Sequence, residues 1–302
     1  MPALVLLLAS LLCWTVPDLP VQKRPVFATA SFLGKNRMFL EDLNRDEVRI
    51  FENGRPREVE FFSGPEVPTA YGLLFDRAIL PLPFDDARRD QVGIPSSMAA
   101  TNVAYQLIDQ GLANQIGWVG TYDKEMRVAL DFSPDTGRIK DVIQQLRAQR
   151  STEESFLYGT LLEAVKKMVQ RNEKRRVLIV FLDFLDTGTG ARLKPLKNLL
   201  TASNVELFIA SFASRTNAGL GLPPPQSEAS LRELAAVTAG GAYFSTMEGI
   251  EGLGRRISNQ IRTFYTIGFQ SESASDQPAP LRIECTRPGV KVMAHPVVPN
   301  LQ

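Results

Sequence analysis

Two continuous apolar runs in the middle of the chain each end on an aspartate. Residues 71–75 are followed by Asp76, and residues 177–182 are followed by Asp183. Apolar runs without alternation are typical of strands buried on both faces, which occur in parallel sheets covered by helices. An aspartate after such a strand lies at the edge where open α/β sheets bind ligands, although a single one also serves as a helix or turn cap.

Segments with helical periodicity alternate with these strands. We predict helices over residues 97–112, 133–146, 157–169, 193–201, 228–238 and 253–261, and further strands over 116–122, 126–130, 205–210 and 242–244. Ser133 and Pro134 are expected as the N-cap and first residue of their helix, and a proline-rich loop is expected up to Pro95. The alternation predicts an α/β fold with a doubly wound, mostly parallel sheet over residues 65–263.

The two ends of the chain follow a different period. Residues 26–32, 47–51 and 57–61 alternate apolar and polar side chains, as do 264–269, 281–284 and 290–294, which is typical of half-buried antiparallel strands. Asn53-Gly54 is a strong hairpin-turn signal. We therefore predict a small β module formed by both flanks, with domains at 1–21 (leader), 22–64, 65–263 and 264–302.

The leader has the pattern of an export signal. Residues 4–12 are apolar, and the run is too short for a membrane span of about 20 residues. A signal-peptide core fits this length, which predicts a secreted, periplasmic or cell-envelope protein; a misassigned start codon or a short anchor is the alternative. Removal of the leader would leave Cys285 as the one cysteine, so no intramolecular disulfide is expected.

Composition and charge limit the classes of function that this chain can have. The net charge of the 302 residues is +1, which gives no general attraction to nucleic acid. We interpret the basic cluster Lys174-Arg175-Arg176 as a solvated helix end. His295 is the sole histidine and is interpreted as a surface residue, so a histidine-ligated zinc site is excluded. No glycine-rich turn follows Asp76, which excludes a phosphate-binding loop.

The order of elements and the two strands ending in aspartate resemble a von Willebrand factor A domain. The stretch 42–54, with Asn53-Gly54 at its end, and the strand 59–62 are similar to the leader of the exported VWFA-related proteins of acidobacteria. Residues 265–269 resemble the strand with which those proteins leave the A domain. The resemblance covers nearly the whole mature chain and implies a Rossmann-like fold for residues 65–263.

The resemblance also implies a metal-ion-dependent adhesion site, in which Mg²⁺ or Mn²⁺ is held by Asp-x-Ser-x-Ser, a threonine and a further aspartate. Asp76 matches the first position and Asp183 the last. Ser155 stands at the threonine position, with Thr152 as the competing alignment.

Two positions of the motif depart from the pattern, because Ala78 and Leu80 replace both serines and supply no side-chain oxygen. We therefore expect Asp76, Ser155 and Asp183 to form a vestigial site without a bound cofactor.

The sequence supports an exported, non-catalytic, adhesion-type interaction domain that binds a protein or a cell-envelope component through loops at the carboxyl edge of the sheet. An alternative is a metal-dependent hydrolase using Asp76 and Asp183, with Asp186 and either Asp85 or Asp86 as further carboxylates. A purely structural envelope component is the third reading.

Overall fold

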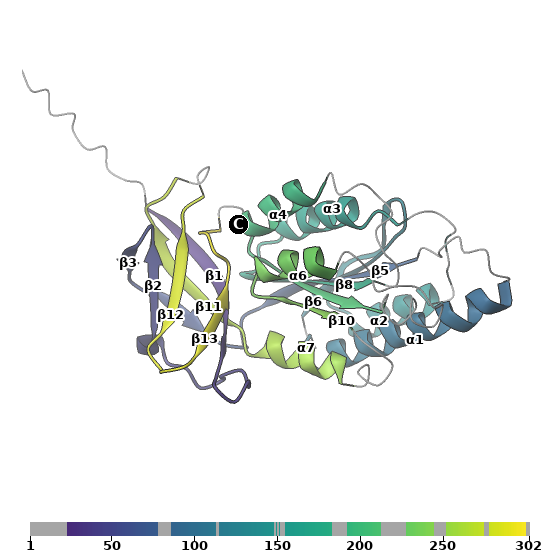
Figure 1. Cartoon of the computed structure of the whole chain (residues 1–302), viewed down its shortest axis with the longest axis horizontal. Helices are drawn as coiled ribbons and strands as arrows, with labels where there is room; N and C mark the ends of the chain where they lie inside the picture. The colour runs from purple at the N-terminus through teal and green to yellow at the C-terminus, as the bar shows by residue number, and fades with distance from the viewer. Residues whose placement is uncertain are drawn as a thin grey trace, which may run out of the picture.

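The structure is a computed structural model, and it describes residues 23–77, 86–112, 115–147, 149, 151, 155–182, 192–212, 228–244, 252–274 and 278–299, of which 86–97 are described as helix only. The expected leader lies outside these residues. Two modules lie next to each other along the long axis of the molecule, an α/β domain and a smaller β module (Figure 1).

The α/β domain is built on a six-stranded sheet within the described ranges. Its order is β10 (Gly241–Phe244), β9 (Val205–Ser211), β8 (Arg175–Leu182), β5 (Thr69–Asp76), β6 (Ile116–Tyr122) and β7 (Met126–Ser133). Every neighbouring pair is parallel except β6 and β7. This confirms the predicted mostly parallel, doubly wound sheet.

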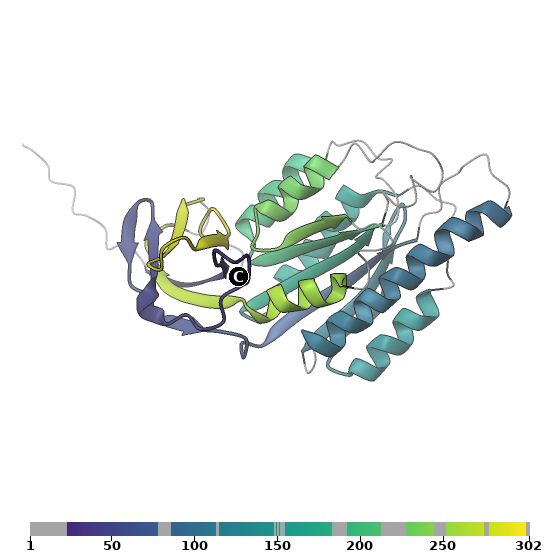
Figure 2. The ribbon, with the colours of Figure 1, turned by 60° about the horizontal axis from the view of Figure 1, so that its bottom comes forward.

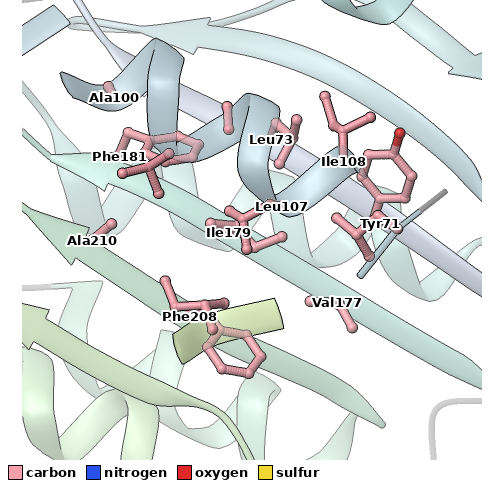
Figure 3. Close-up of a cluster of buried hydrophobic side chains, with 14 of the residues drawn as sticks. Tyr71, Leu73, Ala100, Leu107, Ile108, Val177, Ile179, Phe181, Phe208 and Ala210 are labelled. Atoms are coloured by element: carbon pink, nitrogen blue, oxygen red, sulfur yellow. The ribbon is translucent and has the colours of Figure 1, made fainter. Parts of the chain in front are cut away.

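Helices cover both faces of this sheet (Figures 1 and 2). One face carries α1 (Asp86–Gln110), α2 (Thr136–Leu146) and α7 (Leu253–Arg262), and the other carries α3 (Leu157–Val169), α4 (Leu193–Ala202) and α6 (Glu228–Ala236). Figure 3 shows the first layer, where Leu107 of α1 lies over Ile179 of β8. Every residue of β8 and β9 is buried, as continuous apolar runs predict.

Two predicted helix boundaries were wrong. Helix α1 begins at Asp86 and contains Pro95, where a loop was expected. A proline removes one backbone donor but already has a helical φ, so a long helix can continue through it. Helix α2 is capped by Asp135, whose carboxylate accepts a hydrogen bond from the Arg138 amide (3.0 Å), while Ser133 ends β7.

The β module consists of two sheets within the described part of the chain. One has the order β13 (Lys291–Ala294), β1 (Arg24–Leu33), β11 (Tyr265–Ser271) and β4 (Phe61–Ser63). The other has the order β12 (Leu281–Cys285), β2 (Val48–Glu52) and β3 (Arg55–Arg57), and a short 3₁₀ helix, Arg45–Glu47, precedes β2. The positive φ angles of Asn53 (50°) and Gly54 (76°) close the β2–β3 hairpin, as their sequence predicts.

Strands from the two ends of the chain pair with each other in both sheets. β1 is antiparallel to β11 and β13, and β2 is antiparallel to β12. The predicted strand over residues 57–61 is wrong in detail: β3 ends at Arg57 and β4 begins at Phe61, in different sheets. The inward residues of all these strands form the apolar core of the module, which includes Val26, Phe32 and Ile267.

The interpretation of the basic cluster and of the histidine was wrong. Arg175 and Arg176 are 1% and 3% exposed, and His295 is 1% exposed. Arg175 and His295 contact residues of the other module, so these two groups are buried between the modules. Arg176 donates to the Val169 carbonyl at the end of α3 (3.3 Å), and Lys174 is exposed as expected.

Candidate functional site

The carboxyl edge of the sheet brings together two of the three predicted site residues. Asp76 is the last residue of β5, and Ser155 lies two residues before α3. Ser155 is 1% exposed, and its Oγ donates a long hydrogen bond to Asp76 Oδ2 (3.4 Å). A buried hydroxyl needs such a partner, so the loop before α3 is fixed to the end of β5.

The remaining predicted members lie outside the described residues: Asp183, the alternative Thr152, and the substituted positions Ala78 and Leu80. The strand that leads to Asp183 is described as far as Leu182, and it is the direct neighbour of β5. Phe75 and Phe181 are partners in this pairing, and their rings stack with centroids 4.5 Å apart. The strand ends are therefore rigidly aligned up to the residues in question.

A third strand-end aspartate at this edge was missed by the sequence analysis. Asp123 directly follows β6 and is 2% exposed. Both of its carboxylate oxygens accept from Arg127 Nη1 at 2.7 Å, and Oδ1 also accepts from the Glu125 amide. The signal was present, because Asp123 ends the apolar run 116–122 in the way that Asp76 ends its own run.

The electrostatics of Asp123 favour its charged form. Burial acts to raise the pKa of this carboxyl, but hydrogen bonds from Arg127, Ser151 and the Glu125 amide outweigh burial and lower the pKa below its ordinary value. The negative charge of Asp123 is thus balanced inside the protein by the Arg127 guanidinium.

Backbone hydrogen bonds hold the loop before α3 at two points. The Ser151 amide donates to the Arg77 carbonyl (2.9 Å), and the Phe156 amide donates to the Asp123 carbonyl (3.0 Å). The Arg77 amide in turn donates to the Tyr122 carbonyl (2.8 Å). The ends of β5 and β6 therefore form a firm base for the loop that contains residues 151–155.

The described part of this edge has few metal-ligating groups. In the described residues no group of three or more histidine, cysteine, aspartate or glutamate side chains is placed to hold a metal ion. The sole histidine of the chain, His295, lies at the opposite edge of the sheet, where it contacts Glu206. In the same residues no helix is both long and apolar enough to cross a membrane.

Comparison with known proteins identifies the fold. No family model matches the chain, and no curated protein matches it. Among solved structures it is similar to a von Willebrand factor type A protein from Catenulispora acidiphila, with 9% identity, a TM-score of 0.50, and coverage of 91% of this chain and 73% of that one.

Two other similar structures have lower scores. Proximal thread matrix protein 1 from the mussel byssus shows 12% identity and a TM-score of 0.48, and the match covers 66% of this chain and 48% of that chain, so this chain spans about half of its length. The conserved hypothetical protein BatB from Bacteroides thetaiotaomicron shows 12% identity and a TM-score of 0.45, with coverage of 65% and 100%. From the first similarity and the sheet order described above, the chain has the fold of a von Willebrand factor type A domain.

Proposed function

We propose that this protein is an exported, non-catalytic interaction domain that binds a protein or cell-envelope partner through the loops at the carboxyl edge of its sheet. The segments concerned are residues 77–85, which precede α1, and residues 151–155 and 186–192. The observation that carries the proposal is the double anchoring of the 151–155 loop, through Ser155 to Asp76 and through Ser151 to Arg77. A loop held on a rigid scaffold loses little entropy when a partner binds it.

The second part of the proposal is that binding needs no metal ion. Mg²⁺ requires close to six oxygen ligands in octahedral geometry. At this edge the Asp76 carboxylate accepts a hydrogen bond from the Ser155 hydroxyl, and Arg127 neutralises the negative charge of Asp123. Ala78 and Leu80 add no side-chain oxygen. These residues do not fit the metal site that the fold family implies: Asp76 has a hydroxyl partner in Ser155, and the charge of Asp123 is balanced by Arg127.

Binding of the fluorescently labelled full chain to the cell-envelope fraction of the source organism tests the proposal. We expect saturable binding that survives EDTA and weakens at least about tenfold in Asp76→Ala and Ser155→Ala, because the loop loses its anchor. Arg49→Ala, an exposed residue of the β module, is the matched control and should bind as wild type.

Each competing function has its own outcome in these assays. Metal-dependent hydrolysis of a phosphate or carboxylate ester that is lost in Asp76→Asn would establish the hydrolase. Folded protein with no saturable binding and no turnover would establish the structural component. Export is tested separately by N-terminal sequencing of protein from fractionated cells, where intact Met1 on a cytoplasmic species would contradict it.

A further inference from the structure

The face of the β module that covers the α/β domain carries a row of polar side chains. In sheet register Thr29 of β1 lies opposite Thr266 of β11, which lies opposite Ser63 of β4. Ala30 is paired with Ala294, so His295 continues the same row beyond Thr29. The row crosses all four strands, and it separates the apolar core of the module from the base of the α/β sheet.

One end of this row coincides with both chain crossings between the modules. Residues 64–68 connect β4 to β5, and residues 263–264 connect α7 to β11. Arg175 Nη2 donates to the Gly64 carbonyl (2.9 Å), the Phe264 carbonyl (2.9 Å) and Thr266 Oγ1 (3.2 Å). A single buried guanidinium therefore clamps both crossings, and we call this set the hinge.

Lys174 reinforces the hinge side. Its Nζ lies 4.2 Å from the ring centroid of Phe61 and 4.5 Å from that of Phe27, in a pair of aromatic rings that meet edge to face. Gly268 lies between these two residues in register, and it leaves the space that the rings occupy. A cation between two aromatic faces holds β1 and β4 against the start of β8.

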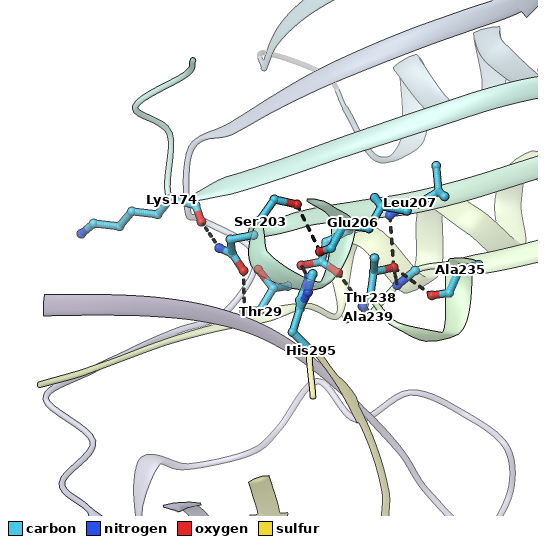
Figure 4. Close-up of polar contacts among 12 residues, drawn as sticks. Thr29, Lys174, Ser203, Glu206, Leu207, Ala235, Thr238, Ala239 and His295 are labelled. Atoms are coloured by element: carbon cyan, nitrogen blue, oxygen red, sulfur yellow. Dashed lines mark hydrogen bonds and ion pairs between the residues drawn. The ribbon is translucent and has the colours of Figure 1, made fainter. Parts of the chain in front are cut away.

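At the other end of the row the modules touch through side chains, and neither of the two chain crossings lies there (Figure 4). His295 Nε2 lies 3.1 Å from Glu206 Oε1, and Glu206 Oε2 accepts from the Ala239 amide (2.6 Å). Asn204 accepts from the Thr29 amide (3.3 Å) and donates to the Lys174 carbonyl (2.9 Å). His295 follows β13, the edge strand farthest from β4, so we call the His295–Glu206 contact the latch.

Several buried polar atoms on this plane lack partners among the described residues. They are Thr29 Oγ1, Ser31 Oγ, His295 Nδ1, Arg175 Nε and Arg176 Nε. A buried polar group without a hydrogen bond opposes burial. The α/β core contains one such atom, Tyr71 Oη, but on the plane between the modules five of them lie together. These atoms weaken the contact between the modules, and the crossings prevent separation at one end only.

We propose that the protein opens as a hinged pair of modules, with the Arg175 clamp as the hinge and the His295–Glu206 contact as the latch. Opening admits water to the polar row and leaves both apolar cores folded. It is a sub-global opening of the kind that native-state exchange detects.

The sole histidine of the chain is a built-in probe of this motion. Diethyl pyrocarbonate modifies an accessible imidazole, and peptide mapping assigns the product to His295. If only globally unfolded molecules reacted, the stability of the protein would set the rate of His295 modification. In the full chain we expect the observed rate to be at least about tenfold higher than that rate and to change little in low urea. The Thr29 amide, which donates across the plane to Asn204 Oδ1, is a second probe of the opening. Its exchange should show the same weak dependence on urea, while the Ile179 amide in the centre of β8 should follow global unfolding.

Two variants separate the latch from the hinge. Glu206→Gln removes the charged partner of His295 Nε2 and should increase the rate of His295 modification about tenfold or more with the circular dichroism spectrum unchanged. Arg175→Lys keeps the charge but loses the forked geometry, and should accelerate modification and global unfolding together. The proposal would be overturned if, in wild type, both the modification of His295 and the exchange of the Thr29 amide required global unfolding, whatever the variants do.

Discussion

Charged residues lie at both edges of the mostly parallel sheet, but different parts of the chain cover the two edges. At the amino-terminal edge, Arg175, Arg176 and Glu206 are buried, and their side chains bond to backbone groups or to His295. At the carboxyl edge, Asp76 and Asp123 hold a loop through serine hydroxyls and a backbone carbonyl. Charged residues at the ends of strands therefore join the sheet to a second module at one edge and to a loop at the other.

The largest effect on stability is expected from removing the hydrogen bonds of Arg175 at the amino-terminal edge. Arg175→Met leaves the Gly64 and Phe264 carbonyls and Thr266 Oγ1 without their buried donor. Each buried acceptor left without a donor costs about 1–3 kcal/mol, so the free energy of unfolding should fall by about 3 kcal/mol or more. Urea denaturation followed by circular dichroism measures the change. Arg49→Met, on an exposed strand position, should leave stability within about 0.5 kcal/mol of wild type. Equal effects in both variants would contradict a clamp at Arg175.

A second variant tests how tightly the modules pack. A Cβ at Gly268 would lie 2.8 Å from Phe61 Cβ and 3.0 Å from Phe27 Cε1, so Gly268→Ala should destabilise the protein by about 1–3 kcal/mol through overpacking. At Gly252 an added Cβ has nothing within 4 Å, which makes Gly252→Ala the matched control. Thermal unfolding that is unchanged in Gly268→Ala would show that the aromatic pair around Lys174 is loosely held.

The carboxyl edge should respond to pH through Asp123. Its pKa is lowered in the folded protein, because the hydrogen bonds from Arg127, Ser151 and the Glu125 amide outweigh burial. The stabilisation is therefore complete above the unfolded pKa of about 3.9 and is lost as the pH falls through the folded value. Asp123→Asn should cost about 1–3 kcal/mol at neutral pH, and the difference from wild type should shrink below about pH 4.

Asp131→Asn is the control for this titration. Asp131 pairs with Lys167 but its side chain is 75% exposed, so the loss of its charge should change stability little. A difference between wild type and Asp123→Asn that stays constant down to pH 2 would contradict the ion pair with Arg127.

The sequence predicted the α/β architecture because its signals are local. The apolar runs of β5 and β8 and the helical periodicity of α3 and α4 follow from burial on fixed faces, and the structure confirms them. The strand at β1 also alternates as predicted, but its polar residues Thr29 and Ser31 are fully buried. Alternation shows that one face is polar, and it cannot show whether water or a second polar surface covers that face.

The sequence named some residues of the candidate site and missed others, again because local patterns are visible in it and long-range contacts are not. Asp76 and Ser155 lie within hydrogen-bond distance of each other at the carboxyl edge, while their assignment to a vestigial adhesion site stays a prediction. Asp123 was missed although its strand ends in the same pattern, since β6 contains Gly117 and Gly120 and is a weaker apolar run. His295 and Arg175 were misplaced, because their burial depends on contacts between segments more than 80 residues apart.

The most direct test of the account is calorimetric titration of Mg²⁺ and Mn²⁺ into the full chain. If the carboxyl edge is balanced by its own residues, wild type should show no binding heat and no rise in melting temperature at millimolar metal. Ala78→Ser combined with Leu80→Ser restores two hydroxyl ligands beside Asp76 and should increase any metal binding. Tight wild-type binding that Asp76→Ala abolishes would contradict the account, because the edge would then be a working metal site.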